Sequence, residues 1–270
     1  MPSSKNENIR LRAYAKINLS LKVISKRPDG YHDIDSIMQS VSLHDEIEIK
    51  TAPQGIRVRC IPDIAPNIAE KAAKTVLEGL KQAKGIDINI IKRIPLAAGL
   101  AGGSADAAAV ITGIDRMYGL NLHRARLMEL GAKVGADVPF CLTGGTCRVT
   151  GIGDKVEKVN PKSGGVFILV FPKIEVSTKE VYDAYDKFGP GNSGNDLESA
   201  AISVAPEIKK IKGRLVKSTG GDWRMSGSGP TLFLELSDLS EAEDHIGKIA
   251  ELDLAHQLVR RMDKGVEVIN

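Results

Sequence analysis

A run of small residues between a strand-like and a helix-like segment constrains this chain more than any other feature. Residues 95–108 read Pro-Leu-Ala-Ala-Gly-Leu-Ala-Gly-Gly-Ser-Ala-Asp-Ala-Ala and follow a strand-like run over residues 86–92. Beyond them, apolar residues recur every three or four positions over residues 107–118, which predicts one face of a helix. Ser104 is a suitable N-cap, and Asp106 falls in the first turn, where a negative side chain suits the helix dipole.

The small residues of this loop predict a phosphate-binding site. Backbone N–H groups at a helix N-terminus bind anions, and small side chains let the anion approach them. Close packing is the other interpretation, but a series of small residues around a single Leu favours phosphate. Two common nucleotide motifs do not fit. Gly103 is followed by Ser104-Ala105 rather than the Lys and Ser or Thr of a P-loop, and Gly-x-Gly-x-x-Gly reads Gly, Ala, Ser at positions 99, 101 and 104.

The composition is that of an ordinary soluble protein with one large domain or two smaller ones. The chain has 270 residues, 42% hydrophobic and 26% charged, and a formal net charge of +3. That charge is too small to predict nucleic-acid binding, and the basic residues clustered over 209–217 are interpreted as the solvated face of a helix. No apolar run reaches the length of a membrane span, and residues 1–8, interpreted as a frayed tail, lack the apolar part of a signal peptide. We expect a cytoplasmic protein without membrane or nucleic-acid partners.

The cysteines and histidines predict no metal site. Cys60, Cys141 and Cys147 are odd in number and form no Cys-x-x-Cys pair. The five histidines are scattered, and no His-Glu-x-x-His occurs. This usage favours reduced thiols in the core of a cytoplasmic protein.

The clearest strand signal lies near the N-terminus. Apolar and polar side chains alternate over residues 13–24, which predicts a strand with Lys16 and Asn18 side by side on its polar face. A strand with one water-exposed face needs no function, so this pattern alone does not make either residue a site residue.

Turn residues then separate further predicted elements. The turn Arg27-Pro28-Asp29-Gly30 precedes an extended run over 31–41, strands over 46–50 and 55–61, and a helix over 66–84. Taken alone, Tyr31 is interpreted as a core residue and His32 as a hydrogen-bonded surface histidine.

Asp137 is a candidate general base. It follows a predicted helix that ends at Gly135, and it precedes an apolar segment that ends at Gly144-Gly145. The C-terminal end of a helix dipole and apolar neighbours both disfavour a carboxylate. An ordinary turn residue and a general base are therefore both open interpretations of Asp137.

The C-terminal part predicts a second α+β unit. A hairpin over 146–159 precedes the best domain boundary, residues 160–165, which divides the chain into 1–160 and 161–270. The predicted strands beyond it span 166–171, 231–236 and 257–261, and the predicted helices span 178–188, 196–203, 206–217 and 240–252. Ser177 and Glu180 form a capping box, and residues 225–230 form a second glycine-rich turn. This order is typical of a ferredoxin-like split βαβ unit.

Three separated motifs together resemble the galactokinase, homoserine, mevalonate and phosphomevalonate (GHMP) kinase superfamily. They are Ala15-Lys16-Ile17-Asn18-Leu19, residues 95–108, and Met225-Ser226-Gly227-Ser228-Gly229. The resemblance covers the chain from residue 10 onward and implies an α+β fold of two domains. Residues 1–160 would form a ribosomal-protein-like α/β domain that binds ATP, and residues 161–270 a ferredoxin-like split βαβ domain on the substrate side.

Other segments resemble one group within this superfamily. They are Arg-Pro-Asp-Gly-Tyr-His at 27–32, Gly-Ala-Asp-Val-Pro-Phe at 135–140, Val-Ser-Thr at 176–178 and Asn-Asp-Leu-Glu at 195–198. They imply ATP-dependent phosphorylation of the 2-hydroxyl of a CDP-linked methylerythritol, 4-diphosphocytidyl-2-C-methyl-D-erythritol, in the non-mevalonate isoprenoid pathway. The alternatives are a mevalonate- or homoserine-type kinase and a non-catalytic nucleotide-binding member. The expected assembly is a monomer or a weak homodimer.

The resemblance also implies residue roles. Asp137 would take the proton from the substrate hydroxyl, while Lys16 would hold Asp137 ionised and offset charge on the transferring phosphoryl group. Asn18 would orient the substrate. Tyr31 would stack on the cytosine ring, and His32 would hydrogen-bond the polar edge of that ring.

The remaining implied residues belong to the two glycine-rich segments and to one threonine. The ATP phosphates would bind to the loop, mainly through its backbone N–H groups: Pro95, Leu96, Ala97, Ala98, Gly99, Leu100, Ala101, Gly102, Gly103, Ser104 and Ala105. Ser104 would also help to place Mg²⁺. Thr178 would bind substrate, and the third motif would contribute Ser226, Gly227, Ser228 and Gly229.

Three positions depart from the family pattern. Tyr14 occupies the place of the Pro that usually precedes Ala-Lys. Ala101 stands where many relatives have Gly, and an Ala in a left-handed conformation would cost about 1 kcal/mol. Ala105 replaces a second Ser, so one hydroxyl near the phosphates is missing. Because backbone amides make most of the expected contacts, we expect weaker ATP binding at most.

Overall fold

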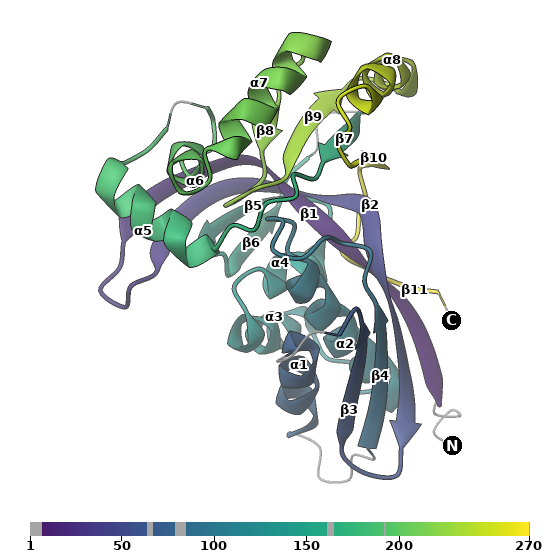
Figure 1. Ribbon diagram of the computed structural model, residues 1–270. Coiled ribbons are helices and arrows are strands. Elements are labelled where there is room, and N and C mark those ends of the chain that lie inside the picture. Colours follow the sequence, from purple (N-terminus) through teal and green to yellow (C-terminus); the bar gives the residue numbers. More distant parts are fainter. Residues whose placement is uncertain (1–6, 64–66, 79–84, 161–164, 192, 270) are drawn as a thin grey trace.

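The computed structural model contains two β-sheets, each with its own set of helices (Figure 1). The structure describes residues 7–63, 67–78, 85–160, 165–191 and 193–269. Most of the predicted frayed tail (1–6), the end of the first predicted helix (79–84) and most of the predicted boundary (161–164) lie outside the described residues. None of the described helices combines the length and the apolar character that a membrane crossing requires.

The first sheet has seven strands and packs against four helices. Its strands are β1 (Asn8–Lys26), β2 (His32–Ala52), β3 (Ile56–Ile61), β4 (Gly85–Ile91), β5 (Thr146–Gly151), β6 (Lys155–Lys158) and β11 (Val266–Val268). Their order is β11-β1-β2-β4-β3, with β5 paired to β2 and β6 to β5. The helices are α1 (Ile68–Leu77), α2 (Gly102–Tyr118), α3 (Arg124–Val134) and α4 (Val138–Thr143). Buried aliphatic side chains from the sheet and from α1–α4 form the larger core.

The second sheet has four antiparallel strands in the order β10-β7-β9-β8. They are β7 (Val166–Val170), β8 (Arg224–Met225), β9 (Leu232–Leu236) and β10 (His256–Arg260), and their helices are α5 (Thr178–Phe188), α6 (Glu198–Val204), α7 (Glu207–Thr219) and α8 (Leu239–Ala250). In chain order the strands lie fourth, first, third, second, which is the ferredoxin-like arrangement. The predicted α+β fold is confirmed. Of the predicted capping box, the structure shows the half in which Ser177 Oγ accepts from Glu180 N at 3.4 Å.

The hairpin of β1 and β2 belongs to both units. Ile17 of β1 packs in the first core, whereas Leu21 packs in the second. Register shifts, typical of β-bulges, fall on either side of Lys16 and Asn18. The glycine-rich segments of both units cover this part of β1, so Lys16 and Asn18 are only 4% and 2% exposed. A water-exposed polar face is therefore the wrong interpretation at these two residues.

Three other local predictions differ from the structure. The extended runs over 31–41 and 46–50 are one strand, β2, because neither Pro nor Gly interrupts the chain between them. The helix α2 begins at Gly102 instead of after Ser104, because Ala101 takes a left-handed φ of 55° and serves as N-cap. A further strand, β11, follows the strand predicted to be last, and three residues are too few to show a period.

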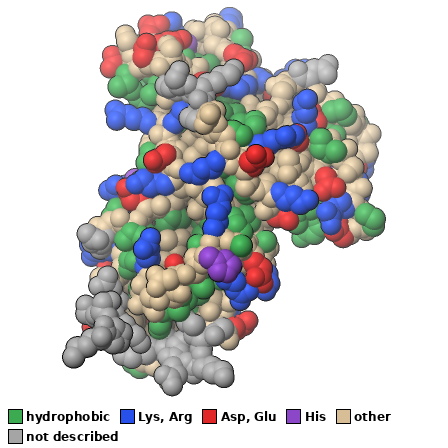
Figure 2. All heavy atoms as spheres, turned by 180° about the vertical axis from the view of Figure 1, so that it is seen from behind, with side chains coloured by type: hydrophobic (Ala, Val, Ile, Leu, Met, Phe, Trp, Pro, Cys, Tyr) green, Lys and Arg blue, Asp and Glu red, His purple; other side chains and the backbone are tan. Residues whose placement is uncertain are grey.

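Charged side chains of both signs share the surface, as the small net charge predicts. On the face drawn in Figure 2, Lys and Arg side chains lie interspersed with Asp and Glu side chains. Most of the basic residues of α7 are exposed, which confirms the solvated helix face. The cysteines are buried free thiols, as expected, and burial raises the pKa of the Cys60 and Cys147 thiols.

The C-terminal segment closes the edge of the first sheet through close backbone packing. β11 pairs with β1, and Gly265, just before it, accepts a hydrogen bond from Tyr14 N at 2.9 Å. The Tyr14 hydroxyl donates to Glu267; burial, and then this carboxylate, raise the pKa of Tyr14 to about 12. A Cβ on Gly265 would lie 1.8 Å from Cys141 O in α4. Only glycine fits between α4 and this segment.

The substitution Gly265→Ala should therefore reduce stability, because the added methyl meets backbone that cannot move independently. We expect its free energy of unfolding, measured by urea denaturation, to fall by about 3 kcal/mol. The matched control is Gly213→Ala in α7, where an added Cβ meets no atom within 4 Å. That change should raise stability by about 0.5–1 kcal/mol through helix propensity. Equal stabilities of the two variants would contradict this interpretation.

Candidate active site

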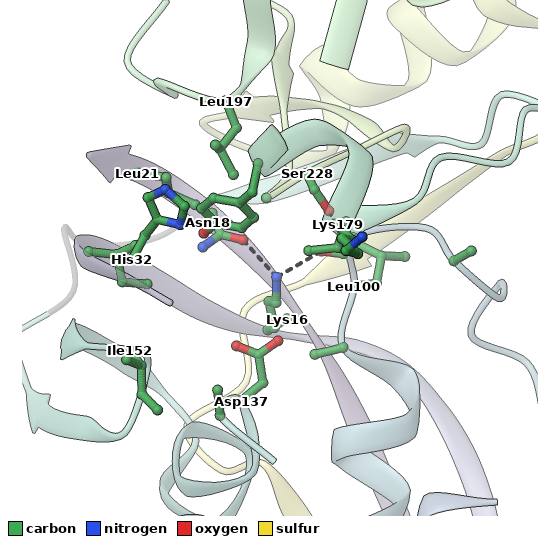
Figure 3. A pocket seen from close by; sticks show the side chains of 18 of the residues that line it. Lys16, Asn18, Leu21, His32, Leu100, Asp137, Ile152, Lys179, Leu197 and Ser228 are labelled. Carbon is green, nitrogen blue, oxygen red and sulfur yellow. Dashed lines mark hydrogen bonds between the residues drawn. The ribbon is translucent and has the colours of Figure 1, made fainter. Parts of the chain in front are cut away.

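A cavity of about 820 Å³ lies where the two units meet (Figure 3). Most of the predicted site residues line it: Lys16, Asn18, Tyr31, His32, residues 95–103, Asp137, Thr178, Gly227 and Ser228. Of the others, Ser104 and Ala105 form part of the first turn of α2, where Ala105 is completely buried. Ser226 and Gly229 belong to the same turn as Gly227, and Ser226 is also completely buried. Segments from both halves of the chain thus meet around one space.

Lys16 is a buried cation whose contacts are all neutral. Its Nζ donates to Asn18 Oδ1 at 2.7 Å and to Gly99 O at 2.8 Å. The Asn18 side chain is itself held, because its Nδ2 donates to Ser36 Oγ at 2.9 Å. No carboxylate of the described residues forms an ion pair with Lys16. A buried charge without a counter-ion is costly, so this site favours an anionic ligand.

The turn after β8, residues 225–230, packs directly on the glycine loop. Ser226 Oγ donates to Gly99 O at 3.1 Å and accepts from Asn18 N at 3.2 Å. Gly99 has a φ of 71°, and a Cβ on it would lie 2.4 Å from Ser226 O. Glycine at position 99 is therefore required for these two segments to touch.

Asn195 fixes the shape of the same turn and was not predicted as a site residue. Its Nδ2 donates to Met225 O at 2.9 Å and to Gly227 O at 2.8 Å. A Cβ on Gly227 would lie 3.0 Å from Asn18 Oδ1 and 3.2 Å from Lys16 Nζ. The Asn-Asp-Leu-Glu segment was the signal that could have identified Asn195. Its contacts, however, are made across the fold rather than along the chain.

The start of α2 leaves backbone N–H groups without helical partners beside the cavity. Ala105 N makes the first helical bond, to Ala101 O at 2.9 Å, so the amides of residues 102–104 have no acceptor within the helix. Gly102 and Gly103 line the cavity. Ala97 and Ala101 are both left-handed, with φ of 49° and 55°. The unfavourable conformation considered for Ala101 is therefore present, as local strain at a ligand site.

Asp137 faces Lys16 across the cavity (Figure 3). It follows α3 as predicted, but it is also the N-cap of α4. The N-terminus of α4 favours a carboxylate, so this second helix opposes the unfavourable effect expected from the end of α3. Its carboxylate makes no hydrogen bond to the described residues and no direct ion pair with Lys16. Both charged groups are available to a ligand between them.

The structure reverses the interpretations of Tyr31 as a core residue and of His32 as a surface residue. Tyr31 is 59% exposed at the cavity wall, whereas His32 is 8% exposed. The His32 ring stacks on Tyr182 of α5, with centroids 4.8 Å apart and planes 25° apart. Nearby, Thr178 Oγ1 lies 2.9 Å from Ser228 Oγ. Tyr182, which the sequence pattern did not single out, places a second tyrosine at the cavity.

A buried ion cluster at the start of α2 was not predicted. Lys92 Nζ donates to Asp45 and, at 2.7 Å, to Asp106. All three side chains are almost completely buried, and Asp106 Oδ1 has no hydrogen-bond partner among the described residues. Burial raises the pKa of Asp106 to about 8. The sequence separates these residues widely, and only the packing of α2 on the sheet brings them together.

Asp106→Asn should change how stability depends on pH. The folded-state pKa of about 8 exceeds the ordinary value of 3.8, so folding takes up a proton and wild-type stability falls as pH rises through this interval. The Asn variant lacks this titration. Its stability relative to wild type should therefore rise with pH, by up to about 1.4 kcal/mol per pH unit. Denaturant unfolding at several pH values measures the difference, and a difference independent of pH would contradict the assignment.

The chain is similar to known kinases along most of its length. The GHMP kinase N-terminal domain model matches residues 67–145, and the C-terminal model matches residues 179–252. The 4-diphosphocytidyl-2-C-methyl-D-erythritol kinase of Acetivibrio thermocellus is 46% identical, covering 84% of this chain and 89% of that protein. The one of Bacillus velezensis is 43% identical, covering 82% and 86%.

Solved structures share the whole fold. A crystal structure of 4-(cytidine 5'-diphospho)-2C-methyl-D-erythritol kinase has a TM-score of 0.80 and 30% identity, and the match covers 93% of this chain and 98% of that one. A homoserine kinase from Cytophaga hutchinsonii has a TM-score of 0.77 at 18% identity, and the match covers 100% of this chain and 99% of that one. At this identity the likeness shows the fold alone. This chain belongs to the GHMP kinases and, within them, to the 4-diphosphocytidyl-2-C-methyl-D-erythritol kinase family. The resemblance noted from the motifs is confirmed.

Proposed function

We propose that this protein transfers a phosphoryl group from ATP to the 2-hydroxyl of 4-diphosphocytidyl-2-C-methyl-D-erythritol, in the non-mevalonate isoprenoid pathway. One observation carries the proposal: a single cavity joins Lys16 and Asp137 to the glycine loop and to the Tyr31-His32 pair. Its volume of about 820 Å³ suits a nucleotide-sized ligand. The relatives at 43–46% identity carry the name of this kinase.

The ATP phosphates would bind at the start of α2. The unpartnered amides of residues 102–104 and the positive end of the α2 dipole favour an anion there. Lys16 adds a buried positive charge that is hydrogen-bonded to the same loop through Gly99 O. Phosphoryl transfer depends mainly on such positioning and charge stabilisation, because the protein forms no covalent bond to the phosphoryl group.

Mg²⁺ would accompany ATP, and the donors present fit an ion held mainly by the phosphates. Ser104 Oγ lies 4.0 Å from the position of a Cβ on Gly135, so it faces the segment that leads to Asp137. Mg²⁺ in kinases keeps few protein ligands beside phosphates and water. Ser104 would hold it, and the bound ion would offset phosphate charge.

Asp137 would act as the general base. Its carboxylate has no competing hydrogen bond in the described part of the chain, and the ammonium group of Lys16 faces it. A positioned base contributes about 10²–10⁴-fold to such a reaction. Lys16 would attract the developing negative charge during transfer.

The acceptor substrate would occupy the other part of the cavity. The exposed ring of Tyr31 is free to stack on cytosine, and His32 is held in place to hydrogen-bond the polar edge of the base. Asn18 and Thr178 line the same cavity. A mevalonate- or homoserine-type kinase would have no use for a base-binding region of this kind.

The substrate is tested by measuring ADP release with three acceptors offered separately. We expect turnover with 4-diphosphocytidyl-2-C-methyl-D-erythritol and none above background with mevalonate or homoserine, because only the first carries a base for Tyr31 and His32. Turnover of mevalonate without turnover of the cytidyl compound would overturn the substrate assignment. ATP binding without turnover of any acceptor would support the non-catalytic alternative.

The base is tested by Asp137→Asn, which keeps the shape of the side chain and removes the carboxylate. We expect kcat to fall by about 10²–10⁴-fold while the ATP Kd stays within about threefold of wild type. Asp222→Asn is the matched control, since its side chain is 91% exposed and should leave kcat unchanged. Activity of Asp137→Asn within tenfold of wild type would remove this residue from the mechanism.

A further inference from the structure

His32 is held by a hydrogen bond that crosses between the two units. Its Nε2 lies 2.7 Å from Asp186 Oδ1 on α5, and the other oxygen of that carboxylate accepts from Lys26 Nζ at 2.6 Å. Tyr182 stacks on the ring, and Tyr185 meets it edge-on at 6.2 Å between centroids. The imidazole therefore has a fixed position and a fixed orientation.

The carboxylate determines which ring nitrogen carries the proton. Hydrogen bonds from Lys26 and then from His32 lower the pKa of Asp186, so it is ionised and can only accept. His32 Nε2 must therefore be the donor. In the neutral ring the lone pair then lies on Nδ1. Nδ1 has no partner among the described residues, and His32 lines the cavity.

This arrangement bears on the choice of base, given the function proposed above. Cytosine presents an amino donor at C4, whereas uracil presents a carbonyl acceptor at the same place. A lone pair on His32 Nδ1 attracts the first group and repels the second. We propose that Asp186, held by Lys26, is a positioning residue that keeps His32 Nδ1 as an acceptor and thereby makes the site select cytosine over uracil.

Lys26 makes the substitution Asp186→Asn informative. A lysine can only donate, so it takes the carboxamide oxygen of the variant and leaves the NH₂ group facing His32. Nε2 must then accept, and the proton moves to Nδ1. The polarity of Nδ1 is reversed while the size of residue 186 is almost unchanged.

Two measurements test the proposal. The ¹⁵N chemical shifts of the His32 ring report the tautomer without any substrate. The ratio of kcat/KM for the cytidine substrate to that for its uridine counterpart reports selection, and the Kd values of CDP and UDP repeat the comparison without turnover. We expect the Nε2–H tautomer in wild type and the Nδ1–H tautomer in Asp186→Asn. The cytidine-to-uridine ratio should fall at least about tenfold in the variant.

Two further variants serve as controls. Asp186→Glu keeps a carboxylate and should retain both the wild-type tautomer and most of the selectivity. Asp244→Asn on α8 removes an equivalent charge from a surface pair with Lys248 at 2.7 Å, and it should change neither readout.

The outcomes separate this inference from the proposed function. A wild-type His32 in the Nδ1–H tautomer would overturn the inference, even if Asp186→Asn did not fold. So would a cytidine-to-uridine ratio in Asp186→Asn within twofold of wild type, in turnover or in nucleotide binding. A wild-type protein that selects CDP over UDP but phosphorylates no cytidyl substrate would contradict the proposed function alone.

Discussion

The carbonyl oxygen of Gly99 is the contact on which the geometry of the site depends. It accepts from Lys16 Nζ at 2.8 Å and from Ser226 Oγ at 3.1 Å, so one atom joins β1, the glycine loop and the turn after β8. The left-handed backbone and missing side chain of Gly99 permit this approach. Through it, the N-terminus of α2 and the second unit are fixed relative to the same lysine.

Two buried lysines differ in function because their hydrogen-bond partners differ in charge. Lys92 contacts Asp45 and Asp106, so its charge is compensated within the protein and ties α2 to the sheet. Lys16 contacts only neutral oxygens, so its charge is available to a ligand. Burial strengthens both effects, because water does not screen either cation. The same residue type therefore serves structure in one place and anion binding in the other.

Local patterns predicted most of the elements, and long-range packing explains the errors. The alternation of apolar and polar residues predicted β1, and Ser177 with Glu180 predicted the start of α5, because both signals lie within a few residues. The left-handed conformation of Ala101 was considered only because many relatives have Gly at this position. The alanine's own preference is against it, and the packing of the loop decides it. The strand β11 was not predicted, because its pairing with β1 joins opposite ends of the chain.

By itself, the sequence determined the chemistry available: a loop of small residues before a helix, Lys16 and Asn18 on one strand, and Asp137 as a candidate base. The motif order was sufficient to indicate the family. Only the tertiary structure decided that Asp137 sits at the N-terminus of α4 opposite Lys16, and that Asp186 holds His32. The physical reason is that hydrogen bonds and burial act over a few ångströms in space. Residues such as 32 and 186 have no spacing that a periodic pattern could reveal.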